Sequence, residues 1–246
     1  MMKTLTLRTA NDDYIDLYSL LKEDTKVILD YFFSLRQSWA IAVLDQINNS
    51  KLYDKFFTGK KYKTVIDLGA HIGLFSLCVK DSCETIHCVE PTKIHFDILN
   101  LLTEKYDNIK KHYCAISNYD GKAEFFECST NNTQNSLLKQ GNLNRGEIAS
   151  LGTVDCFSLL TFLNNNNIEK VDFLKIDIEG GEQILFDDPN LGWLKDRVKI
   201  IFVEIHNIEN GKYANPPEVN KNILLAKLKK LGYTTKVYND AIYAEC

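Results

Sequence analysis

From about residue 62 onward, short apolar runs rich in β-branched residues alternate with longer segments in which apolar residues recur every three or four positions. The short runs predict strands at 64–68, 85–90, 110–116, 171–177 and 199–205. The longer segments predict helices at 73–80, 92–105, 157–163, 181–186 and 217–231. Strands that alternate with helices favour a parallel sheet with right-handed crossovers.

The two ends of the chain follow other patterns. Residues 233–238 and 241–245 flank an Asn-Asp turn, which predicts a C-terminal antiparallel hairpin. Before about residue 60, apolar residues recur at helical spacing, beginning with Tyr14 and Leu17. We therefore expect an N-terminal helical extension over residues 1–60 and one α/β domain over 61–246. The extension would pack on that domain or cover the site where the domain binds its substrate.

One region inside the α/β domain departs from the alternation. Residues 123–128 predict an extra strand, and 129–146 are rich in Asn, Gln, Ser and Gly, which predicts a loop. Long loops at such positions often carry function.

Composition narrows the class of protein. A chain of 246 residues can bury a full core, and a formal net charge of −4 disfavours a nucleic-acid backbone as the main partner. No apolar run is long enough to span a bilayer, and the first residues lack the apolar stretch of a signal peptide. Seven cysteines without a Cys-x-x-Cys pair indicate reduced thiols rather than a zinc site. We expect a cytoplasmic protein, and the sequence leaves its oligomeric state open.

The first chemical motif follows the strand at 64–68. That strand delivers Asp67, and Gly69 and Gly73 then form a tight turn at the start of a helix. A dinucleotide site needs G-x-G-x-x-G, and the acid at Asp67 would repel a pyrophosphate. The same acid would attract the ammonium group of S-adenosylmethionine. Glu90 ends the next strand, where it can take the two hydroxyls of a ribose.

Two further strands deliver acids and a histidine to the same crevice. Asp177 ends the strand at 171–177, and Glu204 and His206 share one face at the end of the next strand. A hydroxyl is a poor nucleophile at neutral pH, so a methyl transfer to oxygen needs a base. His206 is the natural base by its ordinary pKa, with Asp177 or Glu204 either orienting it or serving as the base. Glu182 is expected to do no more than favour a helix N-terminus.

The same residues admit a metal alternative. Asp177, Glu204 and His206 could together hold a divalent cation that binds acceptor oxygens. We regard this as the weaker interpretation, and the metal ligands stay unassigned at the level of sequence.

Together these segments resemble the FkbM family of S-adenosylmethionine-dependent methyltransferases. The resemblance rests on VIDLGAHIGLFSL (65–77), CVEP (88–91), CAISNYDG (114–121), GTVDCFSLL (152–160), VDFLKIDIEGGEQIL (171–185) and FVEIH (202–206). It implies a Rossmann-like class I methyltransferase fold, with a mostly parallel seven-stranded sheet closed by the C-terminal antiparallel hairpin. It also implies transfer of a methyl group to a hydroxyl of a sugar, a glycan or a glycosylated metabolite.

The candidate site follows from the motifs and the resemblance. The predicted cofactor contacts are Asp67, Gly69, His71, Gly73, Glu90, Ala115 and Asp177. The predicted catalytic residues are Asp177, Glu204 and His206.

Two other functions remain open. Lys175, Asp177 and Glu204 resemble part of the Lys/Asp/Lys/Glu set of RNA ribose 2′-O-methyltransferases. The chain could also be a catalytically silent partner subunit that binds S-adenosylmethionine. The acids at several strand ends argue against the silent subunit, and the acidic balance argues against RNA.

Overall fold

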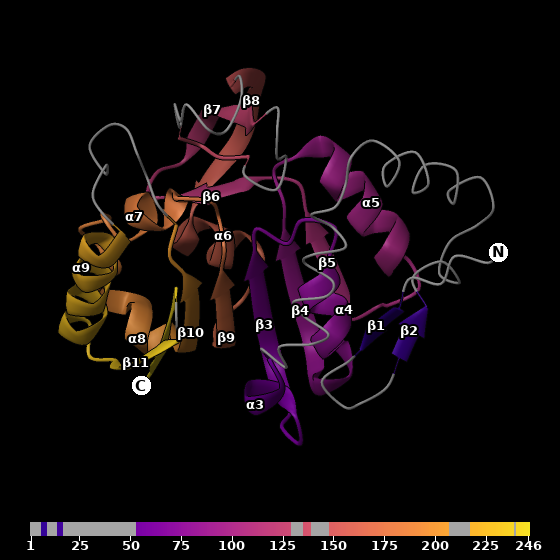
Figure 1. Cartoon of the computed structure of the whole chain (residues 1–246), viewed down its shortest axis with the longest axis horizontal. Helices are drawn as coiled ribbons and strands as arrows, with labels where there is room; N and C mark the ends of the chain where they lie inside the picture. Colours follow the sequence, from indigo (N-terminus) through magenta and orange to yellow (C-terminus); the bar gives the residue numbers. More distant parts are fainter. Residues whose placement is uncertain are drawn as a thin grey trace.

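The computed structural model describes residues 6–8, 14–16, 53–128, 135–138, 148–206, 217–238 and 240–246. At its centre lies a seven-stranded sheet of order β11-β12-β10-β9-β3-β4-β5 (Figure 1). In that order the strands span Thr234–Tyr238, Ala241–Glu245, Val198–Glu204, Val171–Ile176, Tyr62–Leu68, Cys83–Val89 and Ile109–His112. The strands from β10 to β5 run parallel, and β12 is antiparallel to both β10 and β11. The predicted fold class, including the terminal hairpin, is confirmed.

Helices cover both faces of this sheet because successive strand residues point to opposite sides. Val65 packs on one face and its neighbour Ile66 on the other. The face of Val65 is covered by α3 (Asp54–Phe57), α4 (Leu74–Val79) and α5 (Lys93–Thr103). The face of Ile66 is covered by α6 (Leu159–Asn165), α7 (Gly181–Leu185), α8 (Leu194–Arg197) and α9 (Pro217–Lys230). Among the described residues, short 3-10 turns also lie at η1 (Lys80–Ser82) and η3 (Leu191–Trp193).

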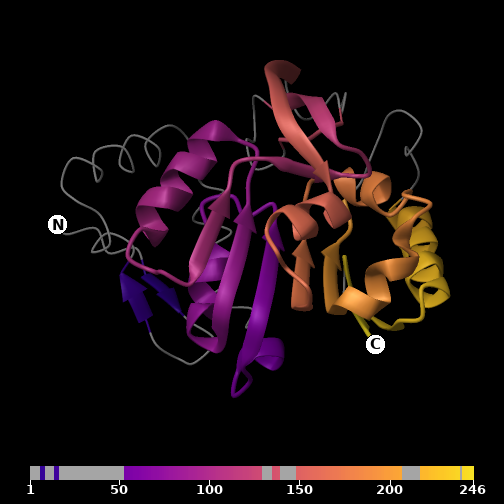
Figure 2. The same ribbon diagram turned by 180° about the vertical axis from the view of Figure 1, so that it is seen from behind.

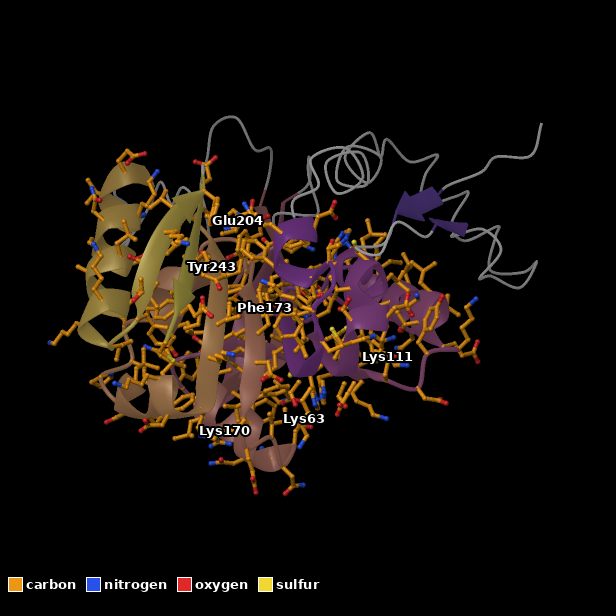
Figure 3. All side chains as sticks on the ribbon, turned by 90° about the horizontal axis from the view of Figure 1, so that it is seen from below. Lys63, Lys111, Lys170, Phe173, Glu204 and Tyr243 are labelled. Atoms are coloured by element: carbon orange, nitrogen blue, oxygen red, sulfur yellow. The ribbon has the colours of Figure 1, made fainter. Side chains whose placement is uncertain are left out.

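An aromatic cluster joins α3 to the sheet. The ring of Phe173 on β9 lies 4.9 Å from Phe57, and Phe56 stacks on Tyr243 at 5.1 Å. Figure 3 labels Phe173 and Tyr243. Tyr53, just before α3, is 5% exposed and packs edge-on against Phe75 at 4.7 Å. The last residues of the predicted extension therefore share the core of the α/β domain, and the boundary near residue 60 stays a prediction.

The helical interpretation of the N-terminal segment is wrong at residues 6–8 and 14–16, whereas Asp54–Phe57 near its end form the helix α3. Tyr14–Asp16 form β2, which pairs antiparallel with β1 (Thr6–Arg8). Here strand pairing overrides the helical spacing that begins at Tyr14. The other residues of the predicted helices up to residue 52 lie outside the described residues.

A second, three-stranded sheet stands over the carboxyl edge of the main sheet (Figures 1 and 2). Its order is β6-β8-β7, formed by Ala115–Ser117, Ile148–Ser158 and Gly121–Cys128. The prediction of one strand over 110–116 is wrong, because the chain leaves β5 after His112 and pairs Ala115 with Cys156 of β8. The predicted strand at 123–128 is confirmed as β7, whereas the pattern did not indicate β8. Most of the predicted loop at 129–146 lies outside the described residues.

No helix in the described ranges combines the length and the apolar character that a membrane crossing requires.

Candidate active site

A cavity lies at the carboxyl edge of the main sheet, where residues of both sheets line it. Its walls are the turns that follow β3, β4 and β9, together with the end of β10. Phe125 of β7 and Leu137 of the following segment contribute apolar side chains from the second sheet. This is the edge at which open parallel α/β sheets bind their ligands.

Gly69 makes the turn after β3 sterically feasible. Its φ is +75°, and its N–H donates to the carbonyl of Val89 at 3.0 Å. A Cβ at this position would lie 1.7 Å from the backbone oxygen of Asp177. Only glycine therefore fits here, and its absence of a side chain lets the β3 and β9 turns meet at the cavity.

Gly73 faces helix α5 rather than the cavity. It has a φ of +87° as the N-cap of α4, and a Cβ there would lie 2.5 Å from Leu99 Cδ1 of α5. Gly73 does not line the cavity. The absence of a side chain at Gly73 lets α4 pack against α5, and its contact with the cofactor stays a prediction.

Glu90 presents a buried carboxylate to the cavity. The residue is 5% exposed, its Oε2 accepts the N–H of His71 at 2.9 Å, and its Oε1 accepts the N–H of Thr92 at 2.7 Å. A carboxylate oxygen can accept more than one hydrogen bond. Each oxygen thus keeps acceptor capacity for a ligand. The ring of His71 packs against His95 at 4.1 Å, and burial holds the pKa of His71 well below its ordinary value.

Asp67 lies behind the cavity wall. It is fully buried, its Oδ2 accepts from Ser76 Oγ at 2.9 Å, and its Oδ1 lies 3.2 Å from Lys175 Nζ. Lys175 also donates to Asp177 Oδ2 at 3.1 Å. Asp67 is not part of the lining and its carboxylate pairs with Lys175, so its contact with a ligand's ammonium group stays a prediction.

His206 is surrounded by carboxylates. Its Nδ1 lies 2.9 Å from Glu182 Oε1, and its Nε2 lies 3.6 Å from Asp177 Oδ1 and 3.7 Å from Glu179 Oε1. Burial alone would lower the pKa of His206, but the charges of Glu179, Glu182 and Asp177 raise it well above its ordinary value. In this arrangement the imidazole holds both ring protons at neutral pH, which disfavours it as a proton acceptor.

Two glutamates in the same wall have raised pKa values. The charge of Asp177 and burial raise the pKa of Glu204 to about 7, and burial raises the pKa of Glu179 to about 7. Within the described part of the chain, the Glu204 carboxylate makes no hydrogen bond, whereas the backbone oxygen of Glu179 accepts from Ser136 Oγ at 2.8 Å. A carboxylate that titrates near neutral pH can accept a proton from a reacting hydroxyl.

The "Methyltransferase FkbM domain" family matches residues 67–234. That span covers most of the chain, including the cavity and the strands that deliver its acids. The chain belongs to this family. The resemblance predicted from the motifs is confirmed, and with it membership of a family of S-adenosylmethionine-dependent methyltransferases.

Several solved structures resemble this FkbM protein at low sequence identity. A methyltransferase FkbM from Methylobacillus flagellatus is 14% identical, with a TM-score of 0.46, over 75% of this chain and 43% of that one. Fibrillarin from Aeropyrum pernix, in complex with natively bound S-adenosyl-L-methionine, is 12% identical, with a TM-score of 0.41, over 75% of this chain and 67% of that one. An S-adenosylmethionine-dependent methyltransferase from Aquifex aeolicus is 13% identical, with a TM-score of 0.41, over 80% and 88%. A comparison with curated proteins finds no match.

Most of the predicted site residues of this FkbM protein line one cavity. They are Gly69, His71, Glu90, Ala115, Asp177, Glu204 and His206. Three further charged groups at or beside the cavity are absent from the predicted catalytic and cofactor-binding residues. They are Lys175, which the sequence places only in the RNA alternative, Glu179, and Glu182, which the sequence places at a helix end. The structure buries Glu182 fully against His206. The spacing of KIDIEGGE was the available signal, because residues 175, 177, 179 and 182 follow one strand into one turn.

Proposed function

We propose that this protein is an S-adenosylmethionine-dependent O-methyltransferase whose acceptor is a hydroxyl of a sugar, a glycan or a glycosylated metabolite. One observation carries the proposal: a single cavity joins the buried carboxylate of Glu90 to the charged group of Asp177, Glu204 and His206. The first suits the nucleoside of the cofactor, and the second suits a reacting hydroxyl. The family supports methyl transfer, and the site chemistry supports oxygen as the acceptor atom.

The lining fits the cofactor by its donor and acceptor groups. The two oxygens of Glu90 each keep acceptor capacity after binding the N–H groups of His71 and Thr92, which suits the two hydroxyls of a ribose. The carboxylate of Asp177 suits the cationic methionine end. When bound, S-adenosylmethionine supplies an electrophilic methyl group on a sulfonium.

The residues of the chain position the acceptor and remove its proton. We propose that Glu204 accepts the proton of the hydroxyl as its oxygen takes the methyl group, because this carboxylate lines the cavity and has a pKa of about 7. His206 holds both ring protons between acids and positions Asp177 and Glu179. Among the residues considered as the base, this proposal selects Glu204 in place of His206.

The test is transfer of an isotope-labelled methyl group from S-adenosylmethionine to a panel of mono- and oligosaccharides. Glu204→Gln should lower kcat by about 10²- to 10⁴-fold and leave the affinity for the cofactor within about twofold of the wild-type value. The exposed Glu169→Gln, on the chain just before β9, is the matched control. Equal turnover in Glu204→Gln and in the control would exclude Glu204 as the proton acceptor.

Ribose 2′-O-methylation of RNA is the second candidate function. It is favoured by the 3.1 Å contact of Lys175 Nζ with Asp177 Oδ2 beside Glu204. We rank it lower because the formal net charge of −4 opposes binding to a phosphate backbone. Salt-sensitive RNA binding with methyl transfer to ribose would promote it, and cofactor binding without turnover on any acceptor would favour a silent partner subunit.

We also propose a cytoplasmic location. Six cysteines are free thiols in the described part of the chain, and five of them are buried. Thiols of this kind persist in a reducing compartment. A fluorescent fusion that localises to an oxidising compartment would contradict this proposal.

A further inference from the structure

We propose that Asp177, Glu179 and His206 bind a divalent cation, and that this cation selects acceptors with two neighbouring hydroxyls. The first half concerns the chain alone. The second half rests on the proposed function, because it names the class of acceptor for that same cavity.

The three side chains converge on one point. One ligand atom from each of Asp177, Glu179 and His206 lies within 4.8 Å of the other two. His206 Nε2 is 3.6 Å from Asp177 Oδ1 and 3.7 Å from Glu179 Oε1. Ligands about 2.1 Å from one cation lie roughly 3 Å apart at right angles and roughly 4 Å apart across it. The two separations from His206 Nε2 fall between these limits, so one cation can reach all three atoms with small side-chain shifts.

The histidine is oriented as metal-binding histidines are. The buried carboxylate of Glu182 lies 2.9 Å from His206 Nδ1, and the same oxygen accepts the N–H of Ile178 at 3.0 Å. A carboxylate on one ring nitrogen fixes the tautomer and turns the other nitrogen toward a metal. Here the other nitrogen, Nε2, faces Asp177 and Glu179, and a bound cation takes the place of the proton that this nitrogen carries in the free protein.

The two carboxylate ligands are also held in place. Lys175 binds Asp177 Oδ2 at 3.1 Å, which leaves Oδ1 as the oxygen that faces His206. Glu179 has a φ of +51°, rare for a residue with a side chain, and Ser136 Oγ donates to its backbone oxygen at 2.8 Å. Both residues also line the cavity, so an acceptor can reach a cation bound between them.

The coordination number defines the acceptor. A six-coordinate cation with three protein ligands has three positions left for oxygens of water or substrate. Two neighbouring hydroxyls of one sugar can fill two of these coordination positions, whereas an isolated hydroxyl can fill only one. Because one imidazole and two carboxylates suit Mn²⁺ as well as other divalent cations, Mn²⁺ is a suitable probe.

The first experiment measures Mn²⁺ binding to the full chain by electron paramagnetic resonance and calorimetry. Wild type should bind one Mn²⁺, Glu182→Gln should weaken binding by about 10- to 100-fold, and Glu179→Gln should weaken it at least as much. His206→Asn gives an independent ligand variant, and Glu169→Gln is the control expected to match wild type. The cation site is refuted if wild type binds no Mn²⁺, or if folded Glu179→Gln and His206→Asn bind it as wild type does.

A second measurement separates this inference from the proposed function. Calorimetry measures the binding of S-adenosylmethionine in the presence of a chelator. A separate assay compares the rate of methyl transfer to a sugar cis-diol with the rate of transfer to its monodeoxy analogue, with and without the chelator. Cofactor binding and equal transfer to both acceptors, unaffected by chelator, would overturn the cation proposal alone. Mn²⁺ binding without cofactor binding would overturn the proposed function alone. Loss of transfer on chelation, restored by Mn²⁺ and restricted to the diol, supports both.

Discussion

The carboxylate of Glu90 gives the sharpest test of the cofactor end of the cavity. In Glu90→Ala the ribose hydroxyls lose a buried, charged acceptor. Hydrogen bonds to a charged group contribute about 1.5–3 kcal/mol, which corresponds to a rise in Kd of roughly 10- to 150-fold. The variant also leaves the N–H groups of His71 and Thr92 without their acceptor, so its stability has to be measured alongside.

Calorimetric titration with S-adenosylhomocysteine measures this change in Kd, with circular dichroism to establish that each variant is folded. Glu84→Ala is the matched control, since Glu84 is exposed on β4, the strand that Glu90 directly follows. Replacing the ligand by 5′-methylthioadenosine and its 2′-deoxy analogue identifies the contact. Wild type should lose affinity for the deoxy analogue, and Glu90→Ala should bind both nucleosides equally.

The assignment of Glu90 to the ribose fails if folded Glu90→Ala binds S-adenosylhomocysteine with the Kd of wild type. It also fails if the variant still distinguishes the two nucleosides as wild type does. Either result would mean that the Glu90 carboxylate accepts hydrogen bonds only from groups of the protein and none from the ribose.

Three further predictions concern stability. Gly69→Ala should destabilise the fold by more than about 3 kcal/mol in urea unfolding, because its Cβ would overlap a backbone oxygen and φ is +75°; a loss below about 1 kcal/mol would show that the turn relaxes. Lys175→Met should cost about 3–5 kcal/mol because it leaves Asp67 buried and unpaired, and adding Asp67→Asn should recover part of that loss; no recovery would contradict the pairing. Burial and the nearby charge of His112 lower the pKa of His87 to about 4. The neutral form of His87 therefore contributes to the stability of the fold, and this contribution is complete at pH values above the unfolded-state pKa of about 6.5. That contribution, at most about 3 kcal/mol, should be lost as pH falls from there toward 4 in wild type, with a flatter pH profile in His87→Gln.

The fold was largely predictable because its strands carry an unambiguous apolar signal. Strand residues such as Val65 and Ile66 are buried on both faces, so the run is continuous and bounded by turn residues. The pattern failed where pairing partners are distant in sequence. Nothing near Ala115 signals that it leaves the main sheet for Cys156, and nothing near Tyr14 signals its pairing with Arg8.

The candidate site was predictable in part for the same reason. Glu90 and His206 follow directly from strand ends, because carboxyl ends of parallel strands meet at one edge. The partners of buried charges were not predictable. The sequence does not show that Lys175 of another strand lies against Asp67. It also does not show that Glu182, which follows a turn into a helix, lies 2.9 Å from His206.

The most direct test of the central claim is methyl transfer itself. Wild-type protein is incubated with S-adenosylmethionine carrying a labelled methyl group and a mixture of sugars, glycans and RNA, and the products are identified by mass spectrometry and fragmentation. We expect one added methyl group on a sugar hydroxyl, formed in equal amount to S-adenosylhomocysteine and lost in Glu90→Ala at limiting cofactor. Methylation of nitrogen or of RNA ribose, or no transfer to any hydroxyl despite cofactor binding, would contradict it.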